Sequence, residues 1–385
     1  MSPRVILFVG NFFFSMFVAL TTYILLPYLS AFMPASYTGF VIAGGALVAL
    51  ALFPLQPFLV ARYGAQQLAL FFAIAEMITL FALAATPGAI AAAILVALSV
   101  SLQPFLYYEL DLLLEATVAE EGTTGRVRNL FLTAWNIGGL AAPLLVGALL
   151  AGSNDAYSRV FLAAGAALVP FVVLFAVRRI PKGLAPKLSH MRDTLLCIMR
   201  DRDLAAVSIG HLVLYLFYIW APLYVPVYLH IVLGIPWSSL GWMFSVMLIP
   251  YVVIQYPAGW VADKILGDKE LMFAGFLVAG SALASISFLT SASSIGLIVS
   301  ILVASRIGSA LIESMTEGHF FRRVSERDIN SISIFRGIWP LGNLIGPLIG
   351  SGILLVGNYQ LLFLLTGGFV IIAGMIATLL IKDFR

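Results

Sequence analysis

Residues 135–144 read WNIGGLAAPL, and residues 339–348 read WPLGNLIGPL. Tryptophan, glycine, leucine, proline and leucine recur in the same order at a constant offset of 204 positions. The same offset relates Glu109 to Glu313, although acidic residues are rare in this chain. A repeat of this length indicates a duplicated half. We expect two similar halves, each with a Gly- and Pro-rich helix that packs closely against a neighbour or bends at Pro143 and Pro347.

Outside these stretches the chain is also strongly apolar. Of its 385 residues, 62% are hydrophobic and 10% are charged, which is too few polar groups for a soluble domain. A helix needs roughly 20 apolar residues to cross a bilayer core. We predict an all-α integral membrane protein with about twelve transmembrane helices in two pseudo-symmetric six-helix bundles. The expected spans are 5–30, 37–60, 67–86, 89–116, 127–151, 158–178, 204–230, 236–262, 270–291, 294–317, 329–356 and 359–381.

The basic residues indicate the orientation. Of the 21 Lys and Arg, 18 fall in the termini or in the loops that follow even-numbered spans. Because such loops face the cytoplasm, we expect a multi-pass protein of the cell membrane (the inner membrane in bacteria) with both termini cytoplasmic. The expected organisation is an N-terminal bundle over 1–178, a cytoplasmic linker over 179–203 and a C-terminal bundle over 204–385.

The linker carries a periodic apolar pattern. Leu188, Met191, Leu195 and Ile198 recur at helical spacing among charged residues. This predicts an amphipathic helix that lies either on the membrane surface or against the cytoplasmic loops. Lipids are therefore expected partners. Cys197, the single cysteine, cannot form an internal disulfide.

One loop carries a recognisable motif. Residues 259–269 read GWVADKILGDK and resemble the cytoplasmic signature of the major facilitator superfamily, Gly-x-x-x-Asp-Arg/Lys followed by Gly and basic residues. The first-half loop, PFLVARYG over 57–64, has Ala61 in place of the acid. The Gly-Pro run at 346–350 is similar to a motif of the family's drug/proton antiporters. The resemblance implies alternating access, usually by a monomer, and a gating role for Asp263 beside a helix N-terminus or Arg322/Arg323. The alternative for Asp263 is a solvated loop acid.

Ionisable residues at depth are the main functional candidates, because a charge in the membrane usually faces water or a partner. By the resemblance, spans 1, 4, 7 and 10 line a central cavity, and a carboxylate there can load and release protons. For Glu109 and Glu313, proton coupling competes with symmetric gating salt bridges, for instance to Arg336 or Arg128. The proton-coupling and gating candidates are Glu109, Asp111, Arg306, Glu313, Arg336 and Asp263.

Span 7 also carries aromatic residues along one face, which favours a ring-bearing or amphipathic substrate through stacking and cation–π contact. For His211, a neutral imidazole bonded within the bundle is an equally good interpretation. The polar residues of span 1 either bind substrate or bond a neighbouring helix, and Gln103 shares this ambiguity. The substrate candidates are Asn11, Thr22, Gln103, His211, Tyr215 and Tyr218.

The sequence excludes several classes of function. It has no phosphate loop for ATP, no metal motif and no soluble domain for catalysis, so we expect neither an enzyme nor a cofactor. Its basic residues form no continuous patch, which argues against a nucleic-acid partner. We expect a secondary transporter of a small solute, coupled to protons and working in efflux. The alternatives are a proton-coupled importer or uniporter of a sugar-like or organic solute, and a receptor that keeps the fold without transport.

Overall fold

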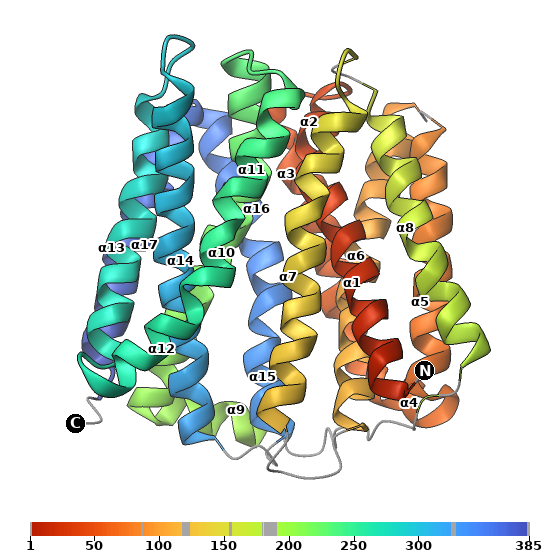
Figure 1. Ribbon diagram of the computed structural model, residues 1–385, viewed down its shortest axis with the longest axis vertical. Coiled ribbons are helices and arrows are strands. Elements are labelled where there is room, and N and C mark those ends of the chain that lie inside the picture. The colour runs from red at the N-terminus through yellow and green to blue at the C-terminus, as the bar shows by residue number, and fades with distance from the viewer. Residues whose placement is uncertain are drawn as a thin grey trace. The chain divides into compact units, whose positions relative to one another are not determined.

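The computed structural model describes residues 2–85, 88–117, 124–153, 156–178, 180, 191–324 and 329–382 (Figure 1). Every regular element among these residues is a helix. Ten helices are long and apolar enough to cross a membrane, and they follow the predicted spans in order. Two shorter apolar helices, Thr133–Leu149 and Trp237–Val253, lie where the fifth and eighth spans are expected. The all-helical membrane fold is confirmed, while the count of twelve crossings stays a prediction.

The chain divides into two compact units. Unit 1 contains Met1–Pro186, Leu229–Ile231 and Ile235–Ser245, and unit 2 contains Lys187–Tyr228, Val232–Gly234 and Val246–Arg385. The first part of the eighth predicted span therefore clusters with unit 1. In that segment, Gly241 lies so close to Gly147 that an added Cβ would meet the other glycine's Cα at 2.7 Å. Ser245 Oγ also donates a hydrogen bond of 2.9 Å to the Leu140 carbonyl.

The long helices of unit 1 are α1 (Pro3–Thr22), α3 (Ala35–Leu52), α5 (Ala65–Ala84), α6 (Ala89–Glu115), α7 (Thr124–Leu149) and α8 (Tyr157–Val177). In this unit α5 packs against α6 and α8, and α1 packs against α7 and α8. The short elements are α2 (Leu25–Ser30), the 3₁₀ turn η1 (Phe53–Leu55) and α4 (Gln56–Tyr63).

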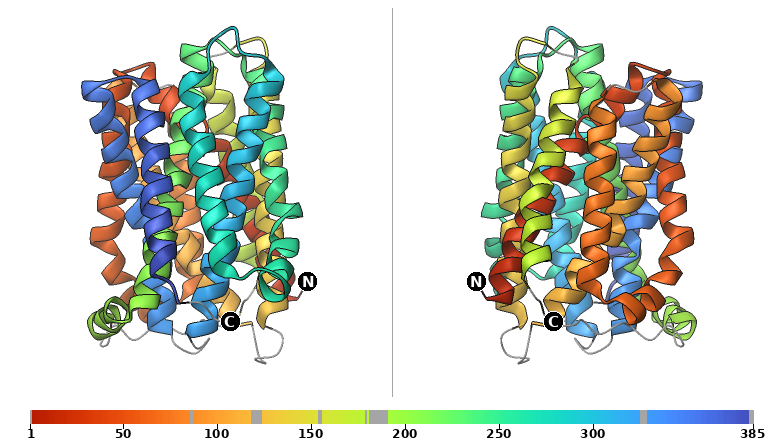
Figure 2. Two further views of the ribbon diagram at one scale, coloured as in Figure 1. Left: turned by 90° about the vertical axis from the view of Figure 1, so that its left-hand side faces the viewer. Right: turned by 90° about the vertical axis from the view of Figure 1, so that its right-hand side faces the viewer.

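The long helices of unit 2 are α10 (Arg202–Val227), α13 (Asp268–Ser285), α14 (Ile295–Arg323), α16 (Ile338–Val356) and α17 (Tyr359–Leu380). Here α13 packs against α14 and α17, and α10 packs against α16 and α17, as Figure 2 (left) shows for the first set. These are the same pairings as in unit 1 when each helix is replaced by its repeat equivalent. The internal repeat is thus a repeat of packing as well as of sequence.

The other elements of unit 2 are α9 (Met191–Arg200), α12 (Gln255–Lys264), α15 (Ile329–Arg336) and the 3₁₀ turn η5 (Ile286–Phe288). The π-helix η4 (Tyr228–Val232) and α11 (Trp237–Val253) contain residues of both units.

Prolines explain where predicted spans are interrupted. Spans 1, 8 and 11 each divide into two helices, at Tyr23–Ile24, at Ile254 and at Gly337. A proline has no N–H for the carbonyl four residues earlier, and its ring crowds that carbonyl. Pro27, Pro257 and Pro340 each follow their break by three or four residues. By contrast, α7 and α16 run on through Pro143 and Pro347, where we expected either a bend or close packing.

The motif glycines sit in the turns between paired helices. Gly64 joins α4 to α5 with φ 83°, and Gly267 joins α12 to α13 with φ 137°. Both values lie in the region that side chains other than glycine rarely adopt. The glycine of the signature is therefore required by the turn in both halves.

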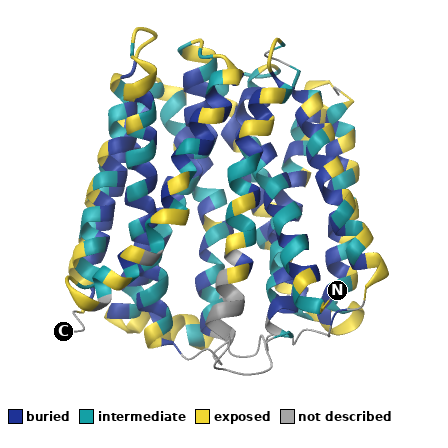
Figure 3. Cartoon of the chain, viewed as in Figure 1, coloured by how far each residue is buried: buried dark blue, intermediate teal, exposed yellow. Residues whose placement is uncertain are grey.

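Much of the surface of the helices is apolar. Large side chains such as Phe71, Ile78, Ile372 and Leu379 are at least 60% exposed, and Figure 3 shows exposed residues along the length of the helices. Such faces fit acyl chains better than water. On α9, Ile198 is buried while Leu195, Leu196 and Met199 are exposed, and the helix packs against α10 and α15.

Candidate functional site

A ladder of rings runs through unit 2 from α15 to α11. Phe335 stacks on His211 with ring centroids 4.1 Å apart, and His211 meets Tyr215 edge to face at 4.9 Å. Tyr215 contacts Tyr218 at 5.8 Å, and Tyr218 contacts Tyr251 at 6.2 Å. We call these five residues the aromatic ladder. Three of them are the substrate candidates of span 7, which lie one turn apart on α10 and therefore share a face.

Two members of the ladder, His211 near one end and Tyr251 at the other, are hydrogen-bonded to α14. The Nδ1 atom of His211 is 3.0 Å from the Thr316 hydroxyl, and both side chains are buried. At the other end, the Tyr251 hydroxyl is 2.6 Å from the Ser309 hydroxyl. The Nε2 atom of His211 has no hydrogen-bond partner among the described residues. The ladder is thus rigidly held but retains a polar atom with which it can bind a further group.

Glu313 lies beside the ladder on α14. Gln255 Nε2 donates a hydrogen bond of 2.8 Å to Glu313 Oε2, and the Tyr218 hydroxyl lies close to the same carboxylate. The side chain has no ion-pair partner in the part of the chain that the structure describes. Amide and phenol groups can stabilise the charged and the neutral form of a carboxyl group, so this setting allows proton exchange.

Arg306 lies two turns before Glu313 on α14. Its side chain is buried, with 3% exposure, and its guanidinium lies over the Phe217 ring at 5.3 Å. No carboxylate lies within ion-pair distance of it among the described residues, and its Nε atom has no hydrogen-bond partner there. Arg306 and Glu313 therefore share a face of α14 but do not form an ion pair with each other.

Arg336 pairs with Glu317, whereas the sequence offered it as a partner of Glu109 or Glu313. Its Nη1 atom is 2.7 Å from Glu317 Oε1, and both side chains are partly exposed. The guanidinium also lies 5.8 Å from the centre of the Phe321 ring. This pair joins α14 to α15, so it belongs to the same end of unit 2 as His211. Arg128, the other partner considered for Glu109 and Glu313, has a side chain outside the described residues.

In unit 1, Glu109 on α6 is the notable residue. It is 0% exposed, and neither carboxylate oxygen has a hydrogen-bond partner among the described residues. It lies one turn after Phe105, whose ring stacks on Phe53 at 6.0 Å and on Phe72 at 5.2 Å. A buried carboxyl group without a hydrogen-bond partner in the described part of the chain is expected to be kept for a function, because its burial costs free energy.

The remaining candidates of unit 1 have ordinary local contacts. Asn11 Nδ2 donates a buried hydrogen bond of 2.8 Å to the Phe131 carbonyl, which joins α1 to α7. Thr22 bonds the Val18 carbonyl of its own helix at 2.7 Å. Gln103 and Asp111 are half-buried on α6. The structure does not bring these four residues together into one cluster.

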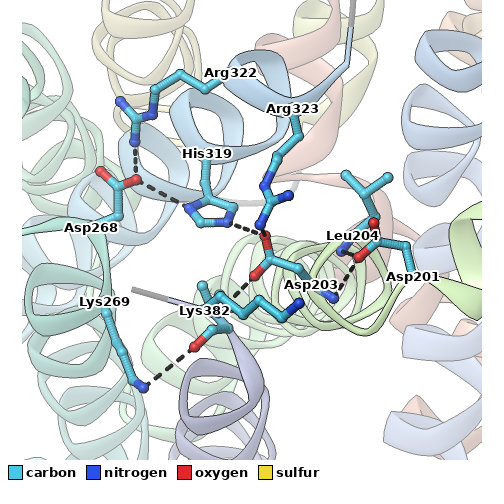
Figure 4. Close-up of polar contacts among 10 residues, drawn as sticks. Asp201, Asp203, Leu204, Asp268, Lys269, His319, Arg322, Arg323 and Lys382 are labelled. Atoms are coloured by element: carbon cyan, nitrogen blue, oxygen red, sulfur yellow. Dashed lines mark hydrogen bonds and ion pairs between the residues drawn. The ribbon is translucent and has the colours of Figure 1, made fainter. Parts of the chain in front are cut away.

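A second polar cluster, which sequence reasoning missed, joins four segments of unit 2 (Figure 4). Asp203, at the start of α10, is 0% exposed and contacts His319 Nε2 at 3.0 Å and Arg323 Nη2 at 2.7 Å. Its other oxygen accepts the backbone N–H of Lys382 at 2.7 Å. His319 Nδ1 lies 3.2 Å from Asp268, which also pairs with Arg322. We call these residues the His319 cluster.

Arg322 and Arg323, which the sequence offered as partners of Asp263, belong to the His319 cluster. The side chain of Asp263 itself lies outside the described residues, although its backbone belongs to α12. The spacing of His319, Arg322 and Arg323 places the three on one face of α14, which is a signal that the sequence did offer. Asp203 carried no such signal, because it follows the linker and resembles an ordinary first-turn acid.

Comparison with known proteins agrees with this architecture. Residues 224–383 match the family model described as Major Facilitator Superfamily. The crystal structure of the nucleoside transporter NupG matches with TM-score 0.77 at 13% identity, covering 99% of this chain and 99% of that one. A bacterial homologue of the human lysosomal transporter Spinster, in an inward-facing and occupied conformation, matches with TM-score 0.76 at 15% identity, covering 99% and 97%.

The chain shares its fold with these two transporters, and its C-terminal part matches the Major Facilitator Superfamily model. The family match covers the C-terminal part of the chain, while the structural matches extend over nearly all of it. The comparison with curated protein sequences found no significant match.

Proposed function

We propose that this chain is a secondary transporter that moves a small ring-bearing solute by alternating access and couples it to protons. One observation carries the proposal: Glu313 lies beside the aromatic ladder, bonded to Gln255 and without an ion-pair partner among the described residues. A carboxyl group next to a solute site can exchange a proton when the solute enters or leaves. Glu109 is the equivalent residue of the other half and has even fewer partners.

The ladder supports the choice of solute. Stacked and edge-to-face rings bind planar groups with little loss of entropy, because the ladder is already held in place by α14. The likeness to a nucleoside transporter is in keeping with a ring-bearing solute. The Gly-Pro run at 346–350 leads us to propose efflux as the direction.

The first step of the test finds a ligand. Detergent-purified protein is screened by thermal shift with nucleosides, aryl carboxylates and their amides at two pH values, because a ligand that binds the folded state raises the melting temperature. The compound with the largest shift is then used in proteoliposomes that contain a pH-sensitive dye.

The second step tests the coupling. In the wild type, addition of the solute is expected to change the lumenal pH. Glu313→Gln keeps the size of the side chain and can still accept the Gln255 hydrogen bond, so it should retain exchange of labelled for unlabelled solute but lose the pH change. Glu270→Gln, at an exposed position of α13, is the control and should behave as wild type. Proton movement that persists in both Glu313→Gln and Glu109→Gln rules out these two residues as the groups that couple protons to the solute.

An importer or uniporter is the second candidate, since a fold shared with a nucleoside transporter is compatible with transport in either direction. Solute movement down its own gradient without any lumenal pH change would assign the uniporter. If no compound binds and no exchange occurs, the chain has the transporter fold without the activity.

A further inference from the structure

Arg306 is a buried cation without a counter-ion among the residues that the structure describes. Its side chain is 3% exposed. The guanidinium forms neither an ion pair nor a hydrogen bond with any of the described residues. A charge at depth in a membrane protein is normally paired or directed at a functional site, since leaving it alone costs several kcal/mol. The contact with the Phe217 ring at 5.3 Å compensates only a small part of this cost.

The groups around Arg306 can donate hydrogen bonds. Both Tyr218 and Tyr251 lie within electrostatic range of the guanidinium. Each phenol O–H can donate a hydrogen bond to an anion, and the guanidinium offers a planar fork of N–H groups. The three side chains come from α10, α11 and α14, all within unit 2. Glu313 also lies near the two phenols, but no carboxylate of the described residues is within ion-pair distance of Arg306, so the three side chains together match an anionic group of a ligand.

The number of charges selects the kind of anion. One unpaired guanidinium balances a single negative charge, whereas a phosphate monoester carries nearly two near neutral pH. The other deep arginine of this unit, Arg336, is already paired with Glu317. A carboxylate also has two oxygens in the plane of the fork, which allows two parallel hydrogen bonds.

The aromatic ladder defines the rest of the ligand. Tyr218 and Tyr251 form one end of the ladder, so a group bound to Arg306 continues directly into stacked rings. We propose that Arg306 binds the carboxylate of the transported solute, and that this solute is an aryl carboxylate whose ring packs on the ladder. This inference rests on the proposed function, because it names the solute class of the same site.

The test compares matched ligands on full-length protein purified in detergent. The probes are phenylacetate, indole-3-acetate and benzoate, each beside its neutral amide. Apparent affinities come from the dependence of the melting temperature on ligand concentration. We expect at least one acid to bind the wild type about tenfold or more tightly than its amide, which corresponds to one charge-assisted interaction.

Three variants assign the effect to the side chain. Arg306→Gln should weaken the acid about tenfold while leaving the amide unchanged, because only the charge is lost. Arg306→Lys should recover part of the affinity, because it keeps the charge but not the planar fork. Arg192→Gln removes an exposed arginine of α9 and should not change the preference for the acid.

Two outcomes overturn the inference. One is that every amide binds as tightly as its acid, and the other is that Arg306→Gln keeps the preference for the acid. If Arg306→Gln does not fold, the comparison of acids with amides on the wild type decides alone. Binding of an acid without any flux in proteoliposomes would reject transport while leaving the anion site in place, so the two proposals fail separately.

Discussion

Among the described residues, the side chains of Asp203 and Glu109 are both fully buried but have opposite surroundings. Asp203 contacts His319, Arg323 and the backbone N–H of Lys382. Glu109 has no hydrogen-bond partner among the described residues. Removing one member of a satisfied buried ion pair leaves the other member uncompensated, whereas removing an unpartnered acid takes away a cost. The two positions should therefore respond to neutralisation with opposite signs.

We expect Asp203→Asn to destabilise the protein by on the order of 3 kcal/mol, because His319 and Arg323 lose their counter-ion. Glu109→Gln should leave stability unchanged or increase it. The measurement is the melting temperature of detergent-purified protein at neutral pH. Asp193→Asn is the control, since this acid is exposed on α9 and should change little. Equal destabilisation by Asp203→Asn and Glu109→Gln would contradict this assignment of the two carboxylates.

At this scale the sequence predicted the unusual residues better than their partners. Glu109, Arg306 and Glu313 were found because ionisable groups are rare inside apolar spans. Their contacts were not predictable, since the Gln255–Glu313 bond joins residues 58 positions apart. Tyr251 was missed because a tyrosine within an apolar run is also typical of a membrane interface.

Among the elements, close packing of helix pairs depends on glycine. Gly308 on α14 faces α13 so closely that an added Cβ would lie 2.4 Å from the Ala279 backbone nitrogen. On α13, Gly275 approaches Gly308 in the same way, because a Cβ added to Gly275 would lie 2.9 Å from the Gly308 carbonyl oxygen. Backbone atoms cannot give way as a flexible side chain can. The α13–α14 pair should therefore tolerate no side chain at either position.

We expect Gly308→Ala to lower the stability of the protein by about 1–3 kcal/mol, the usual cost of overpacking. The matched control is Gly296→Ala on the same helix, where no atom lies within 4 Å of the added Cβ. That change should be neutral or slightly stabilising, because alanine favours a helix more than glycine does. Thermal melting of the two variants provides the comparison. A Gly308→Ala protein as stable as Gly296→Ala would show that α13 and α14 are less tightly packed than described.

The elements themselves were largely predictable. The expected limits of the spans agree with the helices to within a few residues, since twenty-residue apolar runs have few alternative structures. The interruptions at Tyr23, Ile254 and Gly337 were not predicted, although Pro27, Pro257 and Pro340 stand just after them. The sequence contains 18 prolines, and α7 and α16 accommodate theirs without a break. Which prolines interrupt a helix depends on tertiary contacts that can satisfy the freed carbonyl.

For the whole molecule, the distribution of Lys and Arg predicts the topology, and the single cysteine makes it testable. Cys197 is exposed on α9, in a segment that we place in the cytoplasm. A membrane-impermeant maleimide should label it only after intact cells are permeabilised. Ala292→Cys in a Cys197→Ser background introduces a thiol in the exposed turn between α13 and α14, and it should react without permeabilisation. Labelling of Cys197 in intact cells would invert the proposed orientation.

The assignment of Ile235–Ser245 to unit 1 has a consequence for biosynthesis. Chains are made from the N-terminus, so the ribosome completes the first six predicted spans and the linker before this segment exists. Until then the face of α7 around Gly147, which receives Gly241 in the finished protein, has no occupant from its own chain. The compact unit that contains the first half can therefore be completed only after the ribosome has translated part of the second half.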